Sequence, residues 1–364
     1  MALGLYIHIP FCVMKCKYCD FLSFSSTEAD REKYVLALCE EIKNFKCNDT
    51  VDTVYFGGGT PTVLKAEQLS FILKTIKESF VLDRCAEITT ECNPATMGID
   101  GFKELFEAGF NRLSIGLQSA NDEELKLLGR IHSACDCEKA VLDAREAGFK
   151  NISVDLMFGL PYQTMDMWKN SLNTAVQLSP EHISCYGLKI EEGTPFFDMN
   201  YEVDEDLSRD MYDFGVSFLE EKGYSLYEIS NFAKAGFESR HNLKYWKCND
   251  FAGFGLGACS CVNNVRYSNV RDMEEYLRRD NKIEEEIPLT DFDAMSEFVF
   301  LGLRTRKGIS EIEFKNRFKK DIYDVFGEAL QKNIKRGTIE KTEDRLIIPK
   351  EYLYVSNGIL VDFV

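Results

Sequence analysis

Short apolar runs alternate with amphipathic stretches along the N-terminal half of the chain. Six of the apolar runs read as buried parallel strands, at residues 4–9, 53–56, 87–91, 112–117, 151–157 and 182–188. Between them, residues 27–45 and 66–80 place apolar side chains at helical spacing, as Tyr34, Leu38 and Ile42 show. This alternation of strands and helices predicts parallel βαβ units.

A weak internal repeat supports the same architecture. Residues 106–115 and 145–154 are closely similar, and residues 221–229 resemble both. Each copy has a glycine where a helix should end in the left-handed conformation, followed by an aromatic residue and a strand; these glycines are Gly109, Gly148 and Gly223. The sequence therefore predicts an α/β fold, a partial (β/α)6 barrel related to the TIM barrel, with reactive groups at the C-terminal ends of its strands.

The pattern changes after residue 230. Residues 231–262 are rich in Gly, Asn and aromatic side chains, and we expect them to wrap one edge of the barrel. The acidic run 284–286, followed by Pro288, reads as a linker. We therefore predict a barrel over 1–230, an edge-wrapping segment with a linker over 231–288, and a separate C-terminal module over 289–364.

The C-terminal module has the pattern of a small winged-helix-like α+β domain. Helices are expected over 291–303, after a cap at Ser310, and over 321–335 up to Gly337, with a hairpin pairing 338–340 with 346–348. Winged helices often bind DNA, but this segment is not strongly basic, so a packing or docking role is favoured.

Composition excludes several classes of protein. The 364 residues are 45% hydrophobic and 28% charged, as in ordinary globular proteins, and no apolar run approaches the roughly 20 residues that span a bilayer. A net charge of −17 argues against nucleic acid as a partner. Thirteen cysteines, an odd number without a secretory signal, favour a reducing cytoplasm over disulfides.

The strongest chemical signal directly follows the first predicted strand. Pro10 should end that strand, which places Cys12, Cys16 and Cys19 on a loop with C-x3-C-x2-C spacing. Three nearby thiolates can bind one soft metal centre, but zinc normally needs a fourth ligand that no neighbouring Cys or His supplies. A cubane iron–sulfur cluster held by three cysteines leaves one iron open to an external ligand. Packing of the three as small apolar residues is disfavoured because Lys15 and Lys17 interleave them.

Further polar residues fall where predicted strands end. The Gly57–Thr60 turn allows close approach of a ligand to the backbone, although it also fits a simple tight turn before Pro61. Glu91, Gln118 and Asp155 end or interrupt buried strands, where a polar ligand would satisfy them; Asp155 could instead be a structural, hydrogen-bonded carboxylate. Arg130 is either a fork for a carboxylate or an ordinary solvated helix residue.

The chain has only four histidines. His8, His132 and His182 read as structural residues, the first and last of them within strands. His241 differs because Tyr245 and Trp246 follow it, and imidazole with flanking aromatics can hold haem; a polar loop packing its aromatic residues on the barrel is the alternative. Five more cysteines lack a four-ligand array, so we expect buried thiols rather than a second cluster at Cys135, Cys137, Cys248, Cys259 and Cys261.

Together, six motifs resemble the HemW/HemN branch of the radical S-adenosylmethionine (SAM) proteins over nearly the whole chain. They are LYIHIPFC (5–12), GGGTPT (57–62), SIGLQ (114–118), DLMFGLP (155–161), SNFAK (230–234) and HNLKYW (241–246). The branch contains haem chaperones, which deliver haem to target proteins, and oxygen-independent coproporphyrinogen III oxidases, which decarboxylate two propionates to vinyls. Three features resemble the chaperones: Phe21 stands where the oxidases carry a further Cys, only eleven residues precede Cys12, and the HNLKYW motif is present.

The resemblance implies a set of cofactors and ligand-binding residues. Cys12, Cys16 and Cys19 would bind a [4Fe–4S] cluster, and haem would be held partly through His241, Tyr245 and Trp246. The residues that would contact SAM are Tyr6, Tyr18, Gly58, Gly59, Thr60, Glu91, Gln118, Arg130 and Asp155. No catalytic residue is assigned, and the oxidase remains the alternative function.

The same resemblance implies partners. These are haem as cargo, a haem-accepting client protein and, if the cluster is redox-active, an electron donor such as flavodoxin or ferredoxin; a homodimer stays open. The expected location is the cytoplasm, with membrane contact only through a client.

Overall fold

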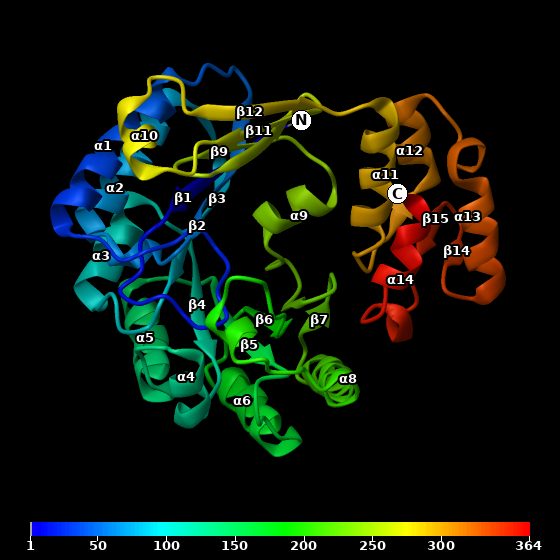
Figure 1. The fold of residues 1–364 in the computed structure, drawn as a ribbon, viewed down its shortest axis with the longest axis horizontal. Coiled ribbons are helices and arrows are strands. Elements are labelled where there is room, and N and C mark those ends of the chain that lie inside the picture. Colours follow the sequence, from blue (N-terminus) through cyan, green and yellow to red (C-terminus); the bar gives the residue numbers. More distant parts are fainter. Residues whose placement is uncertain (1) are drawn as a thin grey trace.

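A single twelve-stranded sheet forms the body of the protein in a computed structural model that describes residues 2–364. The strand order is β12-β11-β10-β9-β1-β2-β3-β4-β5-β6-β8-β7. Its centre is a run of six consecutive parallel strands: β1 (Leu3–Ile9), β2 (Thr50–Gly58), β3 (Val81–Cys92), β4 (Arg112–Gln118), β5 (Ile152–Phe158) and β6 (His182–Gly187). The sheet curves around a central space and leaves the barrel open (Figure 1). The α/β fold predicted as a partial (β/α)6 barrel is confirmed.

Helices connect the parallel strands and cover the outer face of the sheet (Figure 1). They are α1 (Glu28–Asn44), α2 (Ala66–Ser79), α3 (Ile99–Ala108), α4 (Asp122–Leu128), α5 (Ala134–Ala147) and α6 (Met165–Gln177), with a 3-10 turn η1 (Pro61–Val63). Tyr34, Leu38 and Ile42 on α1 are fully buried against the sheet, as their spacing predicts. Gly109 and Gly148 end α3 and α5 with left-handed backbones, so the glycines of the repeat act as predicted.

Several strands are longer than the apolar runs suggested, most of all β3, whereas β6 ends one residue earlier than predicted. Its first five residues, from Val81, are largely exposed and include Asp83 and Arg84, while the buried part begins only at Ala86. Hydrophobic pattern marks the buried part of a strand, so the exposed part of β3 was not predicted from it.

The chain after β6 completes both edges of the sheet. On the β6 side it forms α7 (Pro195–Asp198), α8 (Glu205–Glu221), β7 (Ser225–Leu226) and β8 (Asn231–Ala233). It then crosses the open side as α9 (Arg240–Trp246) and adds β9 (Phe251–Phe254) in parallel to β1. An antiparallel ribbon extends that edge through β10 (Cys259–Val262), β11 (Val265–Asn269), α10 (Met273–Arg278) and β12 (Ile283–Pro288).

The prediction of a linker at residues 284–286 was wrong. These glutamates lie in β12, where Glu286 pairs with Tyr267 and Glu285 with Ser268 of β11. Every residue of β12 is exposed, so the strand has no buried face and shows no apolar alternation in the sequence. Acidic residues on an exposed edge strand also discourage pairing with another chain.

The C-terminal module combines helices with a small sheet. It contains α11 (Asp291–Gly302), β13 (Ile309–Ser310), α12 (Glu311–Phe318), α13 (Ile322–Arg336), β14 (Glu340–Thr342) and β15 (Arg345–Ile347), followed by η2 (Lys350–Tyr352), α14 (Asn357–Leu360) and η3 (Val361–Phe363). The sheet order is β13-β15-β14. Ser310 caps α12 and Gly337 ends α13, as predicted, whereas the hairpin strands are each displaced by one or two residues.

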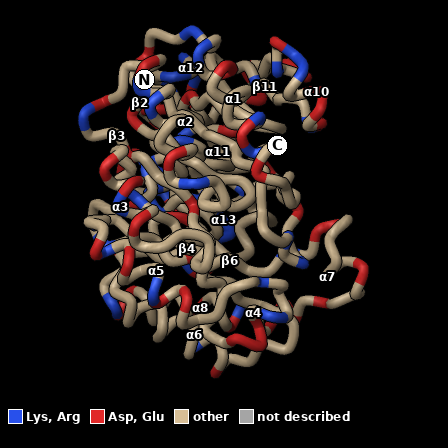
Figure 2. Tube along the Cα trace, turned by 90° about the vertical axis from the view of Figure 1, so that its left-hand side faces the viewer, with Lys and Arg blue, Asp and Glu red and all other residues tan. Residues whose placement is uncertain are grey.

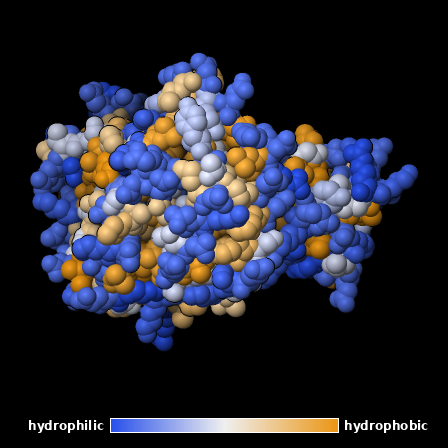
Figure 3. Space-filling view, turned by 90° about the horizontal axis from the view of Figure 1, so that it is seen from below, coloured by the Kyte–Doolittle hydropathy of each residue, from blue (hydrophilic) through white to orange (hydrophobic). Residues whose placement is uncertain are grey.

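Charge is divided unevenly between the barrel and the module. Residues 289–364 carry 13 basic and 13 acidic side chains, so the whole net charge of −17 belongs to residues 1–288. Acidic and basic residues nevertheless intermingle along the surface trace (Figure 2), and the face seen from below is mostly hydrophilic with small scattered apolar patches (Figure 3). None of the helices within residues 2–364 combines the length and the apolar composition needed to cross a bilayer.

Backbone contacts dock the module onto the barrel. The Arg317 guanidinium donates to the carbonyl of Cys248 at 2.8 Å, and the Arg306 N–H donates to the carbonyl of Tyr227 at 3.0 Å. Glu228 and Thr305 form an antiparallel bridge at the same junction. The module therefore packs on the end of α9 and on the turn between β7 and β8, away from the cysteine loop.

Candidate functional site

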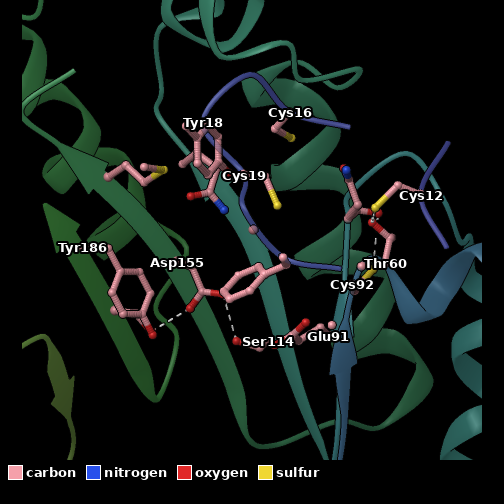
Figure 4. A pocket seen from close by; sticks show the side chains of 18 of the residues that line it. Cys12, Cys16, Tyr18, Cys19, Thr60, Glu91, Cys92, Ser114, Asp155 and Tyr186 are labelled. Atoms are coloured by element: carbon pink, nitrogen blue, oxygen red, sulfur yellow. Dashed lines mark hydrogen bonds between the residues drawn. The ribbon is translucent and has the colours of Figure 1, made fainter. Parts of the chain in front are cut away.

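The cysteine loop begins where β1 ends at Ile9, as Pro10 predicts. It is held at both sides: the Cys12 N–H donates to the Phe24 carbonyl at 3.0 Å, and the Lys17 N–H donates to the Leu128 carbonyl at 2.9 Å. Cys12, Cys16 and Cys19 are free, partly exposed thiols that line one cavity of about 450 Å³. Figure 4 shows this loop lying over the strands that carry Glu91, Ser114 and Asp155.

The arrangement of the three thiols fits a cluster ligand set. Cys12 Sγ lies 3.6 Å from Thr60 Oγ1 and Cys16 Sγ lies 3.6 Å from Arg130 Nη1, so hydroxyl and guanidinium donors face the sulfurs. Such donors stabilise sulfur ligands that carry negative charge. Among residues 2–364, no three His, Cys, Asp or Glu side chains converge on a single metal position. A cubane offers each cysteine a separate iron, so its ligands surround a body rather than a point.

Most of the residues expected to contact SAM share this cavity. Tyr18, Gly58, Gly59, Thr60, Glu91, Gln118, Arg130 and Asp155 all line it. They come from the cysteine loop, the ends of β2 to β4, the interior of β5 and the segment after α4. The fold therefore brings together, in one cavity, residues that lie far apart along the chain and that the sequence predicted as SAM contacts.

Two glycines of the 57–60 turn are required by packing. A Cβ on Gly59 would lie 2.7 Å from the Phe11 carbonyl oxygen, and one on Gly58, whose φ is 112°, would lie 2.5 Å from the His8 ring. The Gly59 N–H also donates to the Ile9 carbonyl at 2.9 Å. These glycines bring the end of β2 against the start of the cysteine loop, and both still line the cavity.

Two buried carboxylates face the cavity, each with its own donors. The Tyr55 hydroxyl donates to Glu91 at 2.8 Å, and burial raises the pKa of Glu91 to about 7. Asp155 accepts from Ser114 at 2.9 Å, Ser184 at 2.6 Å and Ser153 at 3.3 Å, and burial raises its pKa as well. Asp155 is thus hydrogen-bonded within the protein and also lines the cavity. Both alternatives from the sequence, a structural carboxylate and a ligand contact, are compatible with this position.

Gln118 and Arg130 are held in unusual positions. Gln118 has a φ of 66°, a left-handed backbone that is costly for a residue with a side chain and typical of functional sites. Arg130 is not a solvated helix residue: its Nη2 donates to the Gly116 carbonyl at 2.9 Å while Nη1 faces Cys16. It keeps donor capacity on the cavity side, as a carboxylate fork requires.

Tyr6 alone among the expected SAM contacts does not line the cavity. Its hydroxyl lies 3.1 Å from His8 Nδ1, and its ring stacks on Tyr55 and His241. In this arrangement the Tyr6 side chain does not reach the cavity, so a contact between Tyr6 and SAM stays a prediction.

The HNLKYW motif forms α9, a helix beneath the cavity and not the polar loop that was the alternative to a haem site. His241 is only 1% exposed: Nδ1 lies 3.0 Å from Thr53 Oγ1 and Nε2 lies 2.8 Å from the Tyr245 hydroxyl. Burial lowers the pKa of His241 to about 3, so the imidazole is neutral. Both ring nitrogens are occupied, so His241 could ligate haem iron only after giving up one of these hydrogen bonds.

Other contacts fix α9 in this position. The Glu87 carboxylate accepts from the backbone N–H groups of Arg240 and His241, at 3.2 and 3.1 Å, which satisfies the N-terminus of the helix. Lys244 pairs with Asp52 at 2.6 Å. Trp246 is partly exposed and lies under the Arg304 guanidinium, 5.9 Å away, at the junction with the C-terminal module.

The other histidines are structural, as expected. His8 Nε2 lies 3.0 Å from the Leu22 carbonyl, His132 bridges Asn93 and Leu117, and His182 bridges Ser153 and Tyr227. His182 also lines the cavity, which its position at the start of β6 did not reveal.

The remaining cysteines correct one expectation. Cys137 is a buried thiol, but Cys135 and Cys259 are exposed, and Cys248 and Cys261 are partly exposed. None is disulfide-bonded, and none belongs to a metal-binding group within residues 2–364.

Sequence reasoning missed several cavity residues, among them Arg112, Tyr186 and the charged side chains Asp20, Lys189 and Glu191. Tyr186 was hidden within an apolar run. Arg112 begins β4 and looked like an ordinary polar residue preceding a strand. Alternation along β4 was the available signal, because Arg112 shares a face with Ser114, Gly116 and Gln118.

Comparisons with known proteins were made at the level of domain families and whole chains. Residues 6–175 match the radical SAM superfamily, and residues 289–351 match the HemN C-terminal domain. Heme chaperone HemW of Lactococcus lactis is 34% identical, covering 99% of this chain and 96% of that protein. Heme chaperone HemW of Bacillus subtilis is 35% identical, covering 99% and 98%.

A solved structure shares the whole fold. Coproporphyrinogen III oxidase (HemN) from Escherichia coli, described as a radical SAM enzyme, aligns with a TM-score of 0.88 at 24% identity, covering 100% of this chain and 90% of the other. At that identity the likeness concerns the fold alone.

Proposed function

The chain belongs to the HemW family of radical SAM proteins, and from that premise we propose that it binds haem and transfers it to a client haemoprotein. The observation that carries this proposal is the similarity to heme chaperones over 99% of the chain at 34–35% identity. The oxidase fold shared with HemN does not select between the two functions, because both belong to one branch with one architecture.

We propose that Cys12, Cys16 and Cys19 hold a [4Fe–4S] cluster at the mouth of the cavity. The donor set fits: three thiols on one loop face the same space, with Thr60 and Arg130 beside the sulfurs of Cys12 and Cys16. A bound cluster of this kind supplies redox chemistry and one iron without a protein ligand, where SAM can attach.

The walls of the cavity supply the remaining contacts in this proposal. Gly58, Gly59 and Thr60 line the cavity beside the cysteine loop. Because Gly58 and Gly59 have no side chains, their backbone is accessible to a ligand. Glu91 and Asp155 offer carboxylate acceptors for hydroxyl or amino groups, and Gln118 offers an amide. Arg130 retains donors for a carboxylate beside Cys16.

For haem, the proposal must account for the position of α9. His241 and Tyr245 hydrogen-bond to each other in the described structure, whereas Trp246 is partly exposed at the junction with the module. We propose that His241 serves as an iron ligand only in a state in which α9 has left Thr53 and the floor of the barrel has opened. Haem binding through His241 would then be coupled to a conformational change.

The proposal also includes a client that accepts haem and, if the cluster cycles, an electron donor such as flavodoxin or ferredoxin. A homodimer is compatible with it. These partners follow from the family and from no contact in the described structure.

One anaerobic experiment tests the proposed function. The cluster is reconstituted in the full chain, haem is titrated while the Soret band is recorded, and coproporphyrinogen III is offered in a parallel sample. We expect a saturable Soret shift without formation of vinyl products. Turnover of coproporphyrinogen without haem binding would establish the oxidase instead, and a chain that binds neither haem nor SAM would be a scaffold.

A further inference from the structure

One buried charged side chain in the cavity, that of Arg112, forms no ion pair in the described part of the chain. Arg112 is only 2% exposed and lines the cavity, yet its Nε is enclosed without a hydrogen-bond acceptor. Within residues 2–364, no carboxylate forms an ion pair with its guanidinium. Arginine has five N–H donors and stays protonated, so a buried, unpaired guanidinium is costly and calls for an anion.

None of the four acidic side chains that line the cavity fills this role: among the described residues Asp20 forms no ion pair, Glu191 pairs with Lys189, and Asp155 and Glu91 are satisfied elsewhere. Asp155 is occupied by three serine hydroxyls and Glu91 by Tyr55. Arg112 influences both carboxylates only through its charge, at a distance longer than a hydrogen bond. The surplus donors of Arg112 are therefore available to a ligand.

A second unpartnered group lies beside it. Thr89 stands opposite Arg112 in the register of β3 and β4, and its hydroxyl is buried without a hydrogen-bond partner. Thr89 is also on the same face of β3 as Glu91, which lines the cavity. Thr89 does not itself line the cavity, so its unpaired hydroxyl marks the lack of acceptors around Arg112 and is not a second contact with the ligand.

Position separates this place from the cysteine loop. Arg112, Ser114, Gly116 and Gln118 alternate along one face of β4 and all line the cavity. At about 3.3 Å per residue, they span about 20 Å from the strand start to its C-terminal end. Arg130 lies at the cysteine end of the cavity, beside Cys16, whereas Arg112 lies at the opposite, deep end.

We propose that Arg112 binds a propionate carboxylate of haem at the deep end of the cavity. This rests on the proposed function, which supplies haem as the cargo; the methionyl carboxylate of SAM belongs at the cysteine end, beside Arg130 and the open iron. Bidentate pairing with a planar carboxylate is the geometry for which a guanidinium is suited.

Paired ligands with and without the carboxylate test this assignment, and SAM serves as the control for the cysteine end. Wild-type protein with a reconstituted cluster and the Arg112→Met variant are titrated with haem and haem dimethyl ester, and separately with SAM and decarboxylated SAM. Arg112→Met should weaken binding of haem about 10- to 100-fold and leave haem dimethyl ester, SAM and decarboxylated SAM within about twofold. Loss confined to SAM would contradict the proposal, because it would place the methionyl carboxylate at Arg112.

A stability measurement separates ligand binding from a structural role. Because Arg112 has no partner in the protein, Arg112→Met should leave thermal unfolding of the ligand-free protein unchanged or raise its midpoint. Arg112→Lys, which keeps the charge but loses the fork, should recover only part of the affinity.

The proposal is overturned if Arg112→Met weakens all four ligands equally, weakens none, or lowers the unfolding midpoint while leaving the acid preference of the wild type intact. If wild-type protein binds no haem, the proposed function and this proposal fail together; if it binds haem and Arg112→Met does not weaken that binding, only this proposal fails.

Discussion

The cavity at the C-terminal ends of the strands and the floor that α9 forms beneath it differ in how their polar groups are used. In the cavity, three thiols are free, Gln118 has a strained backbone, and Arg112 has no partner. In the floor, both nitrogens of His241 are hydrogen-bonded and the Glu87 carboxylate receives two backbone N–H groups. Unused hydrogen-bonding capacity marks the place where a ligand binds, since buried polar groups in proteins are otherwise paired.

This difference changes the weight given to the two prominent motifs. Both C-x3-C-x2-C and HNLKYW stand out in the sequence, but the first lines the cavity with all three of its cysteines, whereas the second contributes only Asn242 to the wall. The second completes the interior of the barrel, where His241 stacks on Tyr55 at 5.2 Å. The contrast predicts that cavity substitutions alter ligand binding and floor substitutions alter stability.

The largest expected effect is the loss of the cluster. A Cys12/Cys16/Cys19→Ala variant should lose essentially all bound iron and sulfide after anaerobic reconstitution, because no other cysteines replace the ligand set on this loop. The far-ultraviolet circular dichroism should stay that of the wild type, since the three thiols are partly exposed. A Cys135/Cys259→Ala variant, which removes two exposed thiols, is the matched control and should keep a full cluster. Wild-type iron content in the triple variant would refute this assignment.

His241→Ala should destabilise the fold by about 2–4 kcal/mol, because it leaves a cavity and two unpaired partners in the floor. Equilibrium unfolding in urea measures this, with Tyr245→Phe as a milder change that removes one hydroxyl and costs about 1 kcal/mol. Unchanged stability together with a lost Soret band would instead make His241 a ligand that contributes nothing to the floor.

A pH profile sharpens the comparison through Glu91. Its pKa is raised from 4.5 to about 7 in the folded protein, so between these values the folded state holds a proton that the unfolded state has released. Stability should therefore fall as pH rises from about 4.5 to about 7, and Glu91→Gln should flatten this decline.

Glu228 is the matched control for that profile, because burial raises its pKa to about 7 as well, outside the cavity. Glu228→Gln should flatten the same part of the curve without changing the affinity for SAM, whereas Glu91→Gln should change both. Equal effects of the two variants on SAM affinity would remove Glu91 from the proposed binding site.

The smallest effect is expected at Tyr6. Tyr6→Phe removes one hydrogen bond to His8 and should cost about 1 kcal/mol of stability. Affinity for SAM, measured by calorimetry on the reconstituted protein, should stay within about twofold of wild type because Tyr6 does not line the cavity. A tenfold loss would restore Tyr6 as a direct contact.

The sequence revealed features that follow from local pattern. Strands buried on both faces, such as β5, appear as apolar runs, and Gly109 and Gly148 mark helix ends. The cysteine spacing and the polar residues at strand ends identified the three cysteines and several polar residues of the cavity wall, because parallel strands bring those ends to one edge.

What escaped prediction depends on long-range contacts. The exposed strand β12 has no buried face, so its glutamates looked like a linker. The burial of His241 follows from Thr53 and Glu87, both more than 150 residues away in sequence. Arg112 became a candidate only when its neighbours proved to be paired with other groups.

The most direct test of the central claim is a haem-transfer measurement on the reconstituted full chain. Protein loaded with haem is mixed anaerobically with an excess of an apo-haemoprotein such as apomyoglobin, and the Soret bands of donor and acceptor are followed over time. The account predicts that the acceptor gains its native Soret band as the donor band declines. It also predicts that the rate or the extent of this transfer changes in the triple cysteine variant. Haem that never binds to the wild-type chain, or binds and is never released to the acceptor, would contradict it.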